Sequence, residues 1–336
     1  MQRVLIPQHL ATLPQALPVG EQFTLSGQTM GTTWTVRYIH SQQHSQHAIH
    51  ALIQDELDLV IRQMSTWQQG SNISLFNQAE ADTWHPLPDP FFTVIDCALK
   101  IAADTNGAFD PTIGPLVNLW GFGPQGERSA PPQADEISRL KASCGWQRLQ
   151  LDTHSRQLRQ PGNAYIDFSG IAKGYGVDRV SQALQRARIE NYLIEVGGEL
   201  YGAGIKPDGQ PWWIALELPP AIASAATESI AALCGVAVAT SGDYRRYFEH
   251  DNQHYAHTID PRTGYPIDRY NNALVSVTVI HEECMQADAL ATALIVMGVR
   301  AALDYAQKHH IATLLIEQTS DGVKEHLSPE LMAMLE

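Results

Sequence analysis

The stretch IDFSGIAKGYGVD, residues 166–178, has residue types and spacing that suit an anion. A strand that ends at Asp167 turns at Ser169-Gly170, and a helix follows with Lys173 in its first turn. Free backbone N–H groups and the helix dipole attract phosphate, Lys173 adds a positive charge, and Gly170 lets the backbone come close. The pattern is neither a P-loop nor GxGxxG. A capped helix with a solvated lysine explains it equally well.

The stretch MQADALATALIVMG, residues 285–298, carries a second candidate set on an apolar helix. Asp288 and Thr292 are separated by one helical turn, which places both side chains on one face. Carboxylate and hydroxyl oxygens are ligands that Mg²⁺ takes when phosphates and waters complete its octahedron. The simpler interpretation is an aspartate stabilised by the helix dipole and a threonine bonded to its own turn.

A third stretch, YAHTIDPRTGYPID, spans residues 255–268 and is typical of a hairpin rim. Asp260-Pro261 and Thr263-Gly264 predict tight turns, and His257 lies beside them. A histidine held by a stiff loop can act as a general base near neutral pH. A hydrogen-bonded structural histidine is the alternative.

Three further segments combine methionine or aromatic residues with small polar ones. They are TMGTTW at residues 29–34, MSTWQQGSNISLFN at 64–77 and GAFDP at 107–111. Such sets can enclose a planar ring, although methionine and aromatic side chains more often belong to an ordinary core.

The elements that must position these residues follow from hydrophobic periodicity. Paired strands are expected at 23–38, interrupted at 27–31, and an apolar, Gly- and Pro-rich loop at 107–124. Helices are expected at 49–64, 91–105, 135–143, 169–186 with Ser169 as N-cap, 228–233 and 287–308. Further strands are expected at 146–151, 164–168, 192–196, 212–218, 273–280 and 312–317, with turns at Gly197-Gly198 and Asp208-Gly209.

Strands and helices mix without a strict βαβ rhythm, so the predicted fold class is α+β, with mixed and antiparallel sheets and packed helices. Neither an internal repeat nor a separating linker is visible. We therefore expect a Pro-rich N-terminal lead at residues 1–22 and a single domain at residues 23–336.

Charge and composition exclude several classes of function. The chain carries 22 Lys+Arg against 36 Asp+Glu, a formal net charge of −14, which argues against a nucleic-acid partner. Uncharged stretches such as residues 229–242 are too short for a transmembrane segment, and the four cysteines show no CxxC spacing. The N-terminus shows no signal peptide and no lipobox, so a cytoplasmic location is expected. A periplasmic lipoprotein with a trimmed start is the alternative.

The motifs, taken in order, resemble a known family. They are T-M-G-T-T, M-S-T-W with S-x-x-S-x-F-N, N-G-A-F-D-P-T-I-G-P-L-V-N-L-W-G-F-G, I-D-F-S-G-I-A-K-G-Y-x-V-D, V-G-G-E, T-S-G-D-Y, H-T-I-D-P-R-T-G-Y-P and A-D-A-L-A-T-A-L. Together they resemble the ApbE family of FAD:protein FMN transferases, from about residue 29 to residue 298. Each motif is weak alone, but eight in one order are specific.

This resemblance implies a Mg²⁺-dependent enzyme that cleaves the FAD pyrophosphate. It would attach FMN through a phosphoester to a Thr or Ser hydroxyl in the flavinylation motif of an acceptor flavoprotein, and release AMP. It also implies an ApbE-like fold with FAD in a cleft between two α/β halves. Such chemistry needs a base for the hydroxyl, charge neutralisation for the pyrophosphate and apolar contacts for the rings.

The resemblance also implies roles for individual residues. Gly170, through its carbonyl, would hold Mg²⁺ with Asp288 and Thr292. His257 is the candidate base, and Asp260 would orient its loop. Contacts to FAD would come from Met30, Trp67, Ala108, Phe109, Asp110, Asp167, Lys173 and Ile259. Trp67 stands where many relatives have tyrosine, which preserves stacking but changes hydrogen bonding.

Two other functions are compatible with the same residues. One is a Mg²⁺-dependent FAD pyrophosphatase, which would release FMN and AMP without a protein acceptor. The other is a non-catalytic FAD-binding protein, which the presence of Asp288, Thr292, Lys173 and His257 together disfavours. An assay with an acceptor protein separates the first from the transferase.

Overall fold

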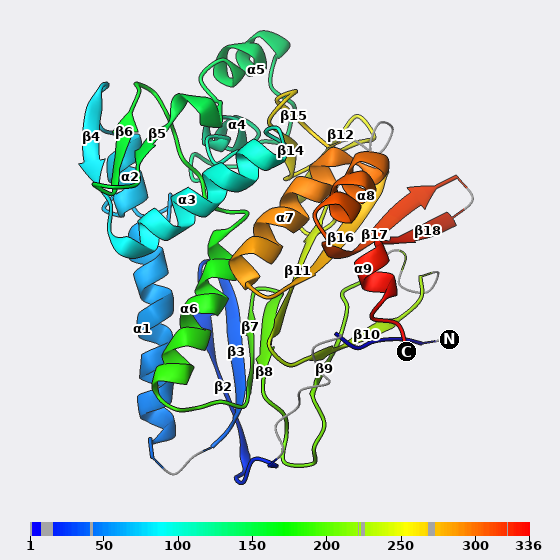
Figure 1. Ribbon diagram of the computed structural model, residues 1–336. Coiled ribbons are helices and arrows are strands. Elements are labelled where there is room, and N and C mark those ends of the chain that lie inside the picture. Colours follow the sequence, from blue (N-terminus) through cyan, green and yellow to red (C-terminus); the bar gives the residue numbers. More distant parts are fainter. Residues whose placement is uncertain are drawn as a thin grey trace.

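An antiparallel sheet of eight strands forms the centre of the computed structural model, which describes residues 2–7, 16–40, 43–220, 222, 226–267, 273–320 and 322–336 (Figure 1). Its strand order is β18-β17-β16-β11-β8-β7-β3-β2. The bounds are β2 Gln22–Thr29, β3 Thr32–Ile39, β7 Tyr192–Val196, β8 Glu199–Ala203, β11 Val236–Gly242, β16 Leu274–His281, β17 Ala312–Thr319 and β18 Gly322–Leu327. The expected α+β fold class is confirmed.

Helices cover one face of this sheet (Figure 1). Helix α7, Cys284–Met297, lies against β11 and β16 and is buried around almost its whole circumference, as its continuous apolar sequence predicts. Helix α6, Ala172–Arg186, packs between α7 and α1, Gln46–Met64. Helix α3, Asp89–Asp104, contacts both α7 and α1, and α8, Val299–Lys308, follows α7 directly.

A small sheet covers the opposite face. It consists of β1 Arg3–Leu5, β10 Ser229–Leu233 and β9 Trp212–Ala215, with β1 parallel to β10 and β9 antiparallel to it. Leu5, Trp212 and Leu233 form one buried cluster with Val238 and Leu314 of the central sheet. Because layers cover both faces of the central sheet here, β16 is buried from Leu274 to Ile280 and β17 is buried from Ala312 to Ile316.

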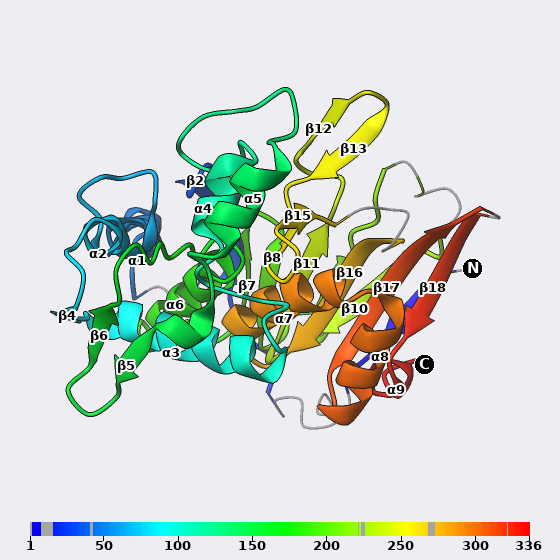
Figure 2. The same cartoon turned by 90° about the horizontal axis from the view of Figure 1, so that it is seen from above.

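Short elements surround one end of α7. The hairpins β12 Tyr247–His250 with β13 Gln253–Ala256 and β14 Ile259–Asp260 with β15 Tyr265–Pro266 lie near α4 Gly114–Leu119 and α5 Ala134–Lys141 (Figure 2). Trp120, Ile137 and Ile259 join these pieces in one apolar cluster. The remaining elements are α2 Asn72–Asn77, β4 Thr83–Pro86, β5 Gln150–Asp152, β6 Gln157–Gln160, the 3₁₀ helix Trp146–Arg148 and α9 Pro329–Met332.

Several expected elements are wrong. In place of the helix expected at 228–233, residues 229–233 form strand β10, because the short apolar run is buried in the small sheet, paired with both β1 and β9. The helix expected at 287–308 is two helices, which meet at Gly298 with φ +77°. The loop expected at 107–124 contains α4, and the strand expected at 146–151 begins as a 3₁₀ helix.

The stretch predicted to bind an anion also differs from its expected form. Residues 164–168 form no strand: the N–H of Ile166 donates to the Asn77 side chain, and the N–H of Asp167 donates to the Pro111 carbonyl. Helix α6 begins at Ala172, without a side-chain cap from Ser169. The turn at Gly197-Gly198 is confirmed, with φ of +59° and +101°. Asp268, the end of the expected hairpin rim, lies outside the described residues.

The N-terminal lead takes part in the fold through β1. Leu5 is fully buried and forms a bridge with Leu335 near the C-terminus. No helix among the described residues combines the length and the apolar character that a membrane span requires.

Candidate active site

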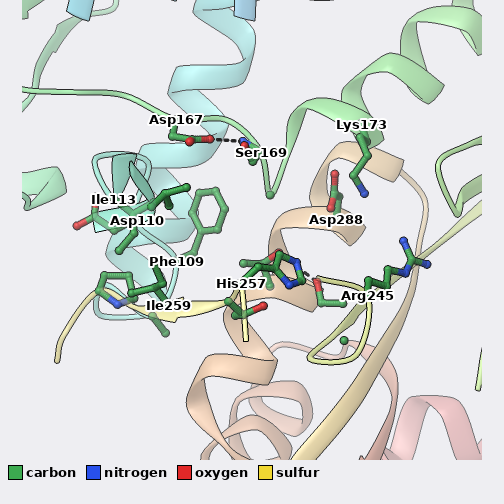
Figure 3. Close-up of a pocket in the computed structure, with 18 of the residues that line it drawn as sticks. Phe109, Asp110, Ile113, Asp167, Ser169, Lys173, Arg245, His257, Ile259 and Asp288 are labelled. Carbon is green, nitrogen blue, oxygen red and sulfur yellow. Dashed lines mark hydrogen bonds between the residues drawn. The ribbon is translucent and has the colours of Figure 1, made fainter. Parts of the chain in front are cut away.

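A pocket lies where the N-terminal end of α6, the middle of α7, the loop before α4 and the segment between β13 and β14 meet (Figure 3). Ten of the thirteen residues predicted for the site line it: Ala108, Phe109, Asp110, Asp167, Gly170, Lys173, His257, Ile259, Asp288 and Thr292. Stretches that are distant in the sequence therefore meet in one place, and the individual roles of these residues stay predictions.

One side of the pocket is apolar. Ala108, Phe109 and Ile259 are at most 6% exposed, and Ile113 and Val117 of the α4 region complete this wall. Figure 3 shows Phe109, Ile113 and Ile259 on one side, and Lys173, Asp288 and Arg245 on the other. A preformed apolar wall beside a few polar groups is typical of a small-molecule site.

The carboxylates of Asp110 and Asp167 hold the backbone that shapes this wall. Asp110 Oδ1 accepts hydrogen bonds from the N–H and hydroxyl of Thr112 at 2.8 and 2.7 Å, and Oδ2 accepts from the N–H of Trp146 at 3.1 Å. Burial raises the pKa of Asp110 above its usual range although these bonds act to lower it. Asp167 accepts from the N–H of Ser169 at 2.7 Å and so orders the turn that leads into α6.

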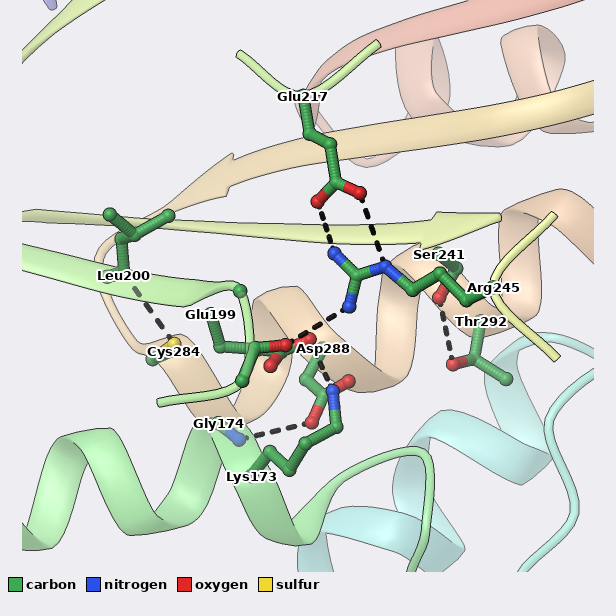
Figure 4. A network of polar contacts seen from close by, with 12 residues as sticks. Lys173, Gly174, Glu199, Leu200, Glu217, Ser241, Arg245, Cys284, Asp288 and Thr292 are labelled. Carbon is green, nitrogen blue, oxygen red and sulfur yellow. Dashed lines mark hydrogen bonds and ion pairs between the residues drawn. The ribbon is translucent and has the colours of Figure 1, made fainter. Parts of the chain in front are cut away.

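The opposite side contains a buried group of charges (Figure 4). Lys173 forms an ion pair with Glu199, the first residue of β8, which is only 1% exposed. Burial raises the pKa of Glu199 to about 7. Burial alone would lower the pKa of Lys173, but the carboxylates of Glu199 and Asp288 outweigh it and raise the pKa. Lys173 is therefore a cation at neutral pH.

Two of the predicted metal ligands, Gly170 and Thr292, lie against one another, and the third, Asp288, lines the same pocket. A Cβ placed on Gly170 would lie 3.0 Å from Thr292 Oγ1, and this hydroxyl is 3.1 Å from Ser241 Oγ. Asp288 is 3% exposed and accepts the N–H of Gly174 at 3.0 Å. In the described part of the chain, no group of three His, Cys, Asp or Glu side chains could hold a metal. A carbonyl, a carboxylate and a hydroxyl nevertheless fit a hard cation that keeps waters and takes phosphate oxygens.

His257 has the protonation state of a potential base. Its Nδ1 lies 3.1 Å from the carbonyl oxygen of Arg246, which can only accept, so Nδ1 carries the hydrogen and Nε2 keeps its lone pair. Burial lowers the pKa of His257 to about 4, and the positive charges of Arg246, Lys173 and Arg245 act in the same direction. The imidazole is therefore neutral at physiological pH.

Three predicted residues lie outside the pocket lining. Asp260 forms a salt bridge with Arg262 at 2.9 Å, and its carbonyl accepts the N–H of Gly264 at 2.8 Å, which is compatible with a role in ordering the loop. Met30, with φ +47°, occupies the β2–β3 turn, and its methyl group approaches Gly176 of α6. The Trp67 side chain is 63% exposed.

Glu199, Ser241 and Arg245 also line the pocket, although no role was predicted for them. Glu199 belongs to the V-G-G-E motif, Ser241 belongs to T-S-G-D-Y, and Arg245 follows it directly. These motifs could have indicated that the three residues belong to the site. A charged residue beside a glycine turn, however, is also common at an ordinary protein surface.

Comparisons with known proteins show the family of this chain. The sequence model of the ApbE family matches residues 30–315. The chain is 41% identical over 319 residues to the FAD:protein FMN transferase of Vibrio cholerae serotype O1, which covers 94% of this chain and 93% of that protein.

Two solved structures share the fold. The flavin transferase ApbE from Vibrio cholerae is 39% identical with a TM-score of 0.85, over 94% of this chain and 100% of that one. The Pseudomonas stutzeri flavinyl transferase ApbE, in its apo form, is 37% identical with a TM-score of 0.85, over 94% of this chain and 96% of that one. Because the family model matches most of the chain and these relatives share its sequence and fold, the chain belongs to the ApbE family.

Proposed function

We propose that this protein transfers FMN from FAD to a Thr or Ser hydroxyl of an acceptor flavoprotein and releases AMP. Family membership supports the reaction class, since the relatives are named FAD:protein FMN transferases. The observation that carries the proposal is the pocket, in which an apolar wall faces Lys173, a set of oxygen donors and a neutral histidine.

The reaction breaks the phosphoanhydride bond between the two phosphates of FAD and forms a phosphoester bond to the acceptor. The acceptor hydroxyl oxygen attacks the FMN-side phosphorus, and its proton passes to Nε2 of His257. The bond between that phosphorus and the bridging oxygen breaks, and AMP departs with the bonding electron pair. Lys173 offsets negative charge on the phosphates, and the wall around Phe109 contacts an aromatic ring of the substrate.

Gly170, through its carbonyl, Asp288 and Thr292 would hold Mg²⁺, which when bound supplies positive charge beside the phosphates. The charge balance of the pocket supports this assignment. Asp110, Asp167, Glu199 and Asp288 give up to four negative charges against two positive ones from Lys173 and Arg245, or 2 − 4 = −2. An anionic pyrophosphate would be repelled from such a site unless a cation entered with it.

The decisive experiment uses the whole chain with FAD, Mg²⁺ and a fusion protein that bears a Thr among small residues. We expect mass spectrometry to find one FMN on that Thr, together with an equal amount of AMP. A matched acceptor with Val in place of Thr should remain unmodified, and EDTA should stop the reaction. FMN and AMP released without an adduct would instead identify a FAD pyrophosphatase, and unchanged FAD would contradict both activities.

We also propose that residues 23–336 form one domain, which the continuity of the central sheet from β2 to β18 supports. The partner is an acceptor flavoprotein with a Thr or Ser flavinylation motif. The cytoplasmic location stays a prediction of the sequence.

A further inference from the structure

Arg245 is a pocket residue whose orientation is set from outside the pocket. Its Nε donates to Glu217 Oε1 at 3.2 Å and its Nη2 donates to Glu217 Oε2, so that the carboxylate binds one edge of the guanidinium through both of its oxygens. Glu217 lies just beyond strand β9 of the small sheet and does not line the pocket. Tyr244 donates its hydroxyl to Glu217 Oε1 at 2.6 Å and holds the carboxylate in turn.

A glycine turn supports the other side of the guanidinium. Nη1 of Arg245 donates to the carbonyl oxygen of Gly197 at 3.0 Å. A Cβ on Gly198, which has φ +101°, would lie only 2.6 Å from Nη2. The guanidinium therefore lies against the turn whose next residue, Glu199, pairs with Lys173 (Figure 4). Both cations are found on the same side of the pocket (Figure 3).

The bonding pattern leaves donors available to a ligand. A guanidinium has five N–H groups in a planar fork, and three of those of Arg245 donate hydrogen bonds to Glu217 and Gly197. One hydrogen on Nη1 and one on Nη2 are not committed to these partners. N–H groups on two neighbouring nitrogens of one rigid, charged plane are suited to donate to phosphate oxygens.

Stability of the fold is a weak explanation for this pair. The side chains of Arg245 and Glu217 are 28% and 38% exposed, and ion pairs in contact with solvent contribute little to folding. A pair that contributes little to stability but holds a cation at the pocket is better explained by its effect on the ligand.

We propose that Arg245 is a second phosphate-binding cation beside Lys173, and that Glu217 is a positioning residue that holds Arg245 for this contact. This inference rests on the proposed function, because it assigns Arg245 to the pyrophosphate of FAD. It also gives the small sheet of β1, β10 and β9 a part in the site, since β9 leads directly into Glu217.

The first test compares ligands with and without phosphate. Flavin fluorescence measures the binding of FAD and of riboflavin to the wild type, Arg245→Ala and Arg245→Lys. We expect Arg245→Ala to weaken FAD binding about tenfold, to leave riboflavin binding within about twofold, and Arg245→Lys to lie between. Arg156→Ala is the matched control, because Arg156 pairs with Asp89 at an exposed surface and does not line the pocket.

The second test is a double-mutant cycle on FMN transfer. Glu217→Ala removes negative charge, so FAD affinity should not weaken by more than about twofold, whereas kcat should fall about tenfold because Arg245 loses its orientation. In the Arg245→Ala background the same change should alter kcat by less than about twofold. If Glu217 had only a structural role, Glu217→Ala would lower kcat by the same factor in both backgrounds.

The outcomes separate this inference from the proposed function. Equal loss of FAD and riboflavin binding in Arg245→Ala, or no loss of either, would overturn the phosphate contact. An unchanged effect of Glu217→Ala in the Arg245→Ala background would overturn its positioning role. A wild type that binds FAD but transfers no FMN would contradict the proposed function, while the comparison of FAD with riboflavin would still decide the role of Arg245.

Discussion

At the scale of single residues, the site combines groups whose charges oppose one another within a small buried volume. Glu199 and Asp288 are almost fully buried, and each would be costly as an isolated charge. Lys173 pairs with Glu199 and lowers the electrostatic cost of both carboxylates. A bound divalent cation would offset the remaining negative charge of the pocket. Removal of the Asp288 carboxylate therefore tests the proposed metal site.

Asp288→Ala should lower FMN transfer by about a hundredfold or more, because the carboxylate is the charged member of the proposed Mg²⁺ ligands. Transfer is measured against Mg²⁺ concentration, and excess Mg²⁺ should not restore the variant. Asp89→Ala, which changes a 78% exposed side chain, is the control and should stay near wild-type activity. A normal Mg²⁺ dependence in Asp288→Ala would refute the assignment.

The pH dependence of transfer tests His257. Because burial lowers its pKa to about 4, the imidazole is a free base above that pH and becomes protonated only below it. We expect kcat/KM for FAD to be lost only as the pH falls toward about 4, and not near the usual histidine pKa of about 6.5. His257→Ala should lower kcat by about 10²–10⁴-fold and change FAD binding far less. An acidic limb near pH 6.5 that vanishes in this variant would contradict the lowered pKa.

At the scale of elements, the contact between α6 and α7 positions both the cation and the metal ligands. Asp178 of α6 accepts the N–H groups of Cys284 and Met285 at 2.9 and 2.8 Å and so caps the start of α7. One turn along, the N–H of Gly174 donates to Asp288. The two helices are thus joined by hydrogen bonds at the level where Lys173 and Asp288 face the pocket.

Gly174→Ala tests this close approach. A Cβ at this position would lie 2.3 Å from the carbonyl oxygen of Cys284 and 2.8 Å from Cβ of Asp288, so the helices must separate. We expect a loss of about 1–3 kcal/mol in the free energy of unfolding, despite the higher helix propensity of alanine, together with weaker FMN transfer. Gly70→Ala is the control, because nothing lies within 4 Å of its added Cβ. Equal stability of the two variants in urea unfolding would show that the helices do not need this contact.

At the scale of the whole molecule, the two ends of the chain meet on the face of the central sheet opposite α7. Leu5 of β1 is fully buried in the cluster that joins the small sheet to β11 and β17, and it forms a bridge with Leu335. Arg3 forms a salt bridge with Glu325 of β18 at 2.5 Å. The N-terminal strand therefore closes an apolar layer beneath the sheet that holds Glu199 and Ser241.

Leu5→Ala should destabilise the protein by about 2–4 kcal/mol, because it leaves a cavity among close-packed side chains. Leu17→Ala, which truncates a side chain that is 58% exposed, should change the free energy of unfolding by less than about 0.5 kcal/mol. Chemical denaturation of both variants measures the difference. If Leu5→Ala unfolded with the wild-type midpoint, the N-terminal strand would be dispensable to the fold.

Local sequence determined much of this protein. The helical spacing of apolar residues correctly indicated α1, α3 and α5, and short apolar runs indicated β7, β16 and β17, because both patterns report which residues of an element are buried. The resemblance carried by the ordered motifs also predicted half of the residues that line the pocket. Residues that are close in the sequence carry these signals themselves.

Tertiary structure decided the rest. Residues 229–233 became a strand because β1, from the N-terminal end of the chain, and β9, the preceding strand, bond to its two edges. The partners of Lys173 and Arg245 are Glu199 and Glu217, and no local pattern brings these pairs together. The hydrogen on His257 Nδ1, which leaves the lone pair on Nε2, is likewise fixed by the carbonyl of Arg246, eleven residues away. Ion pairing and the protonation state of a side chain depend on neighbours that only the folded chain supplies. Site residues could therefore be predicted from the sequence, but their contacts could not.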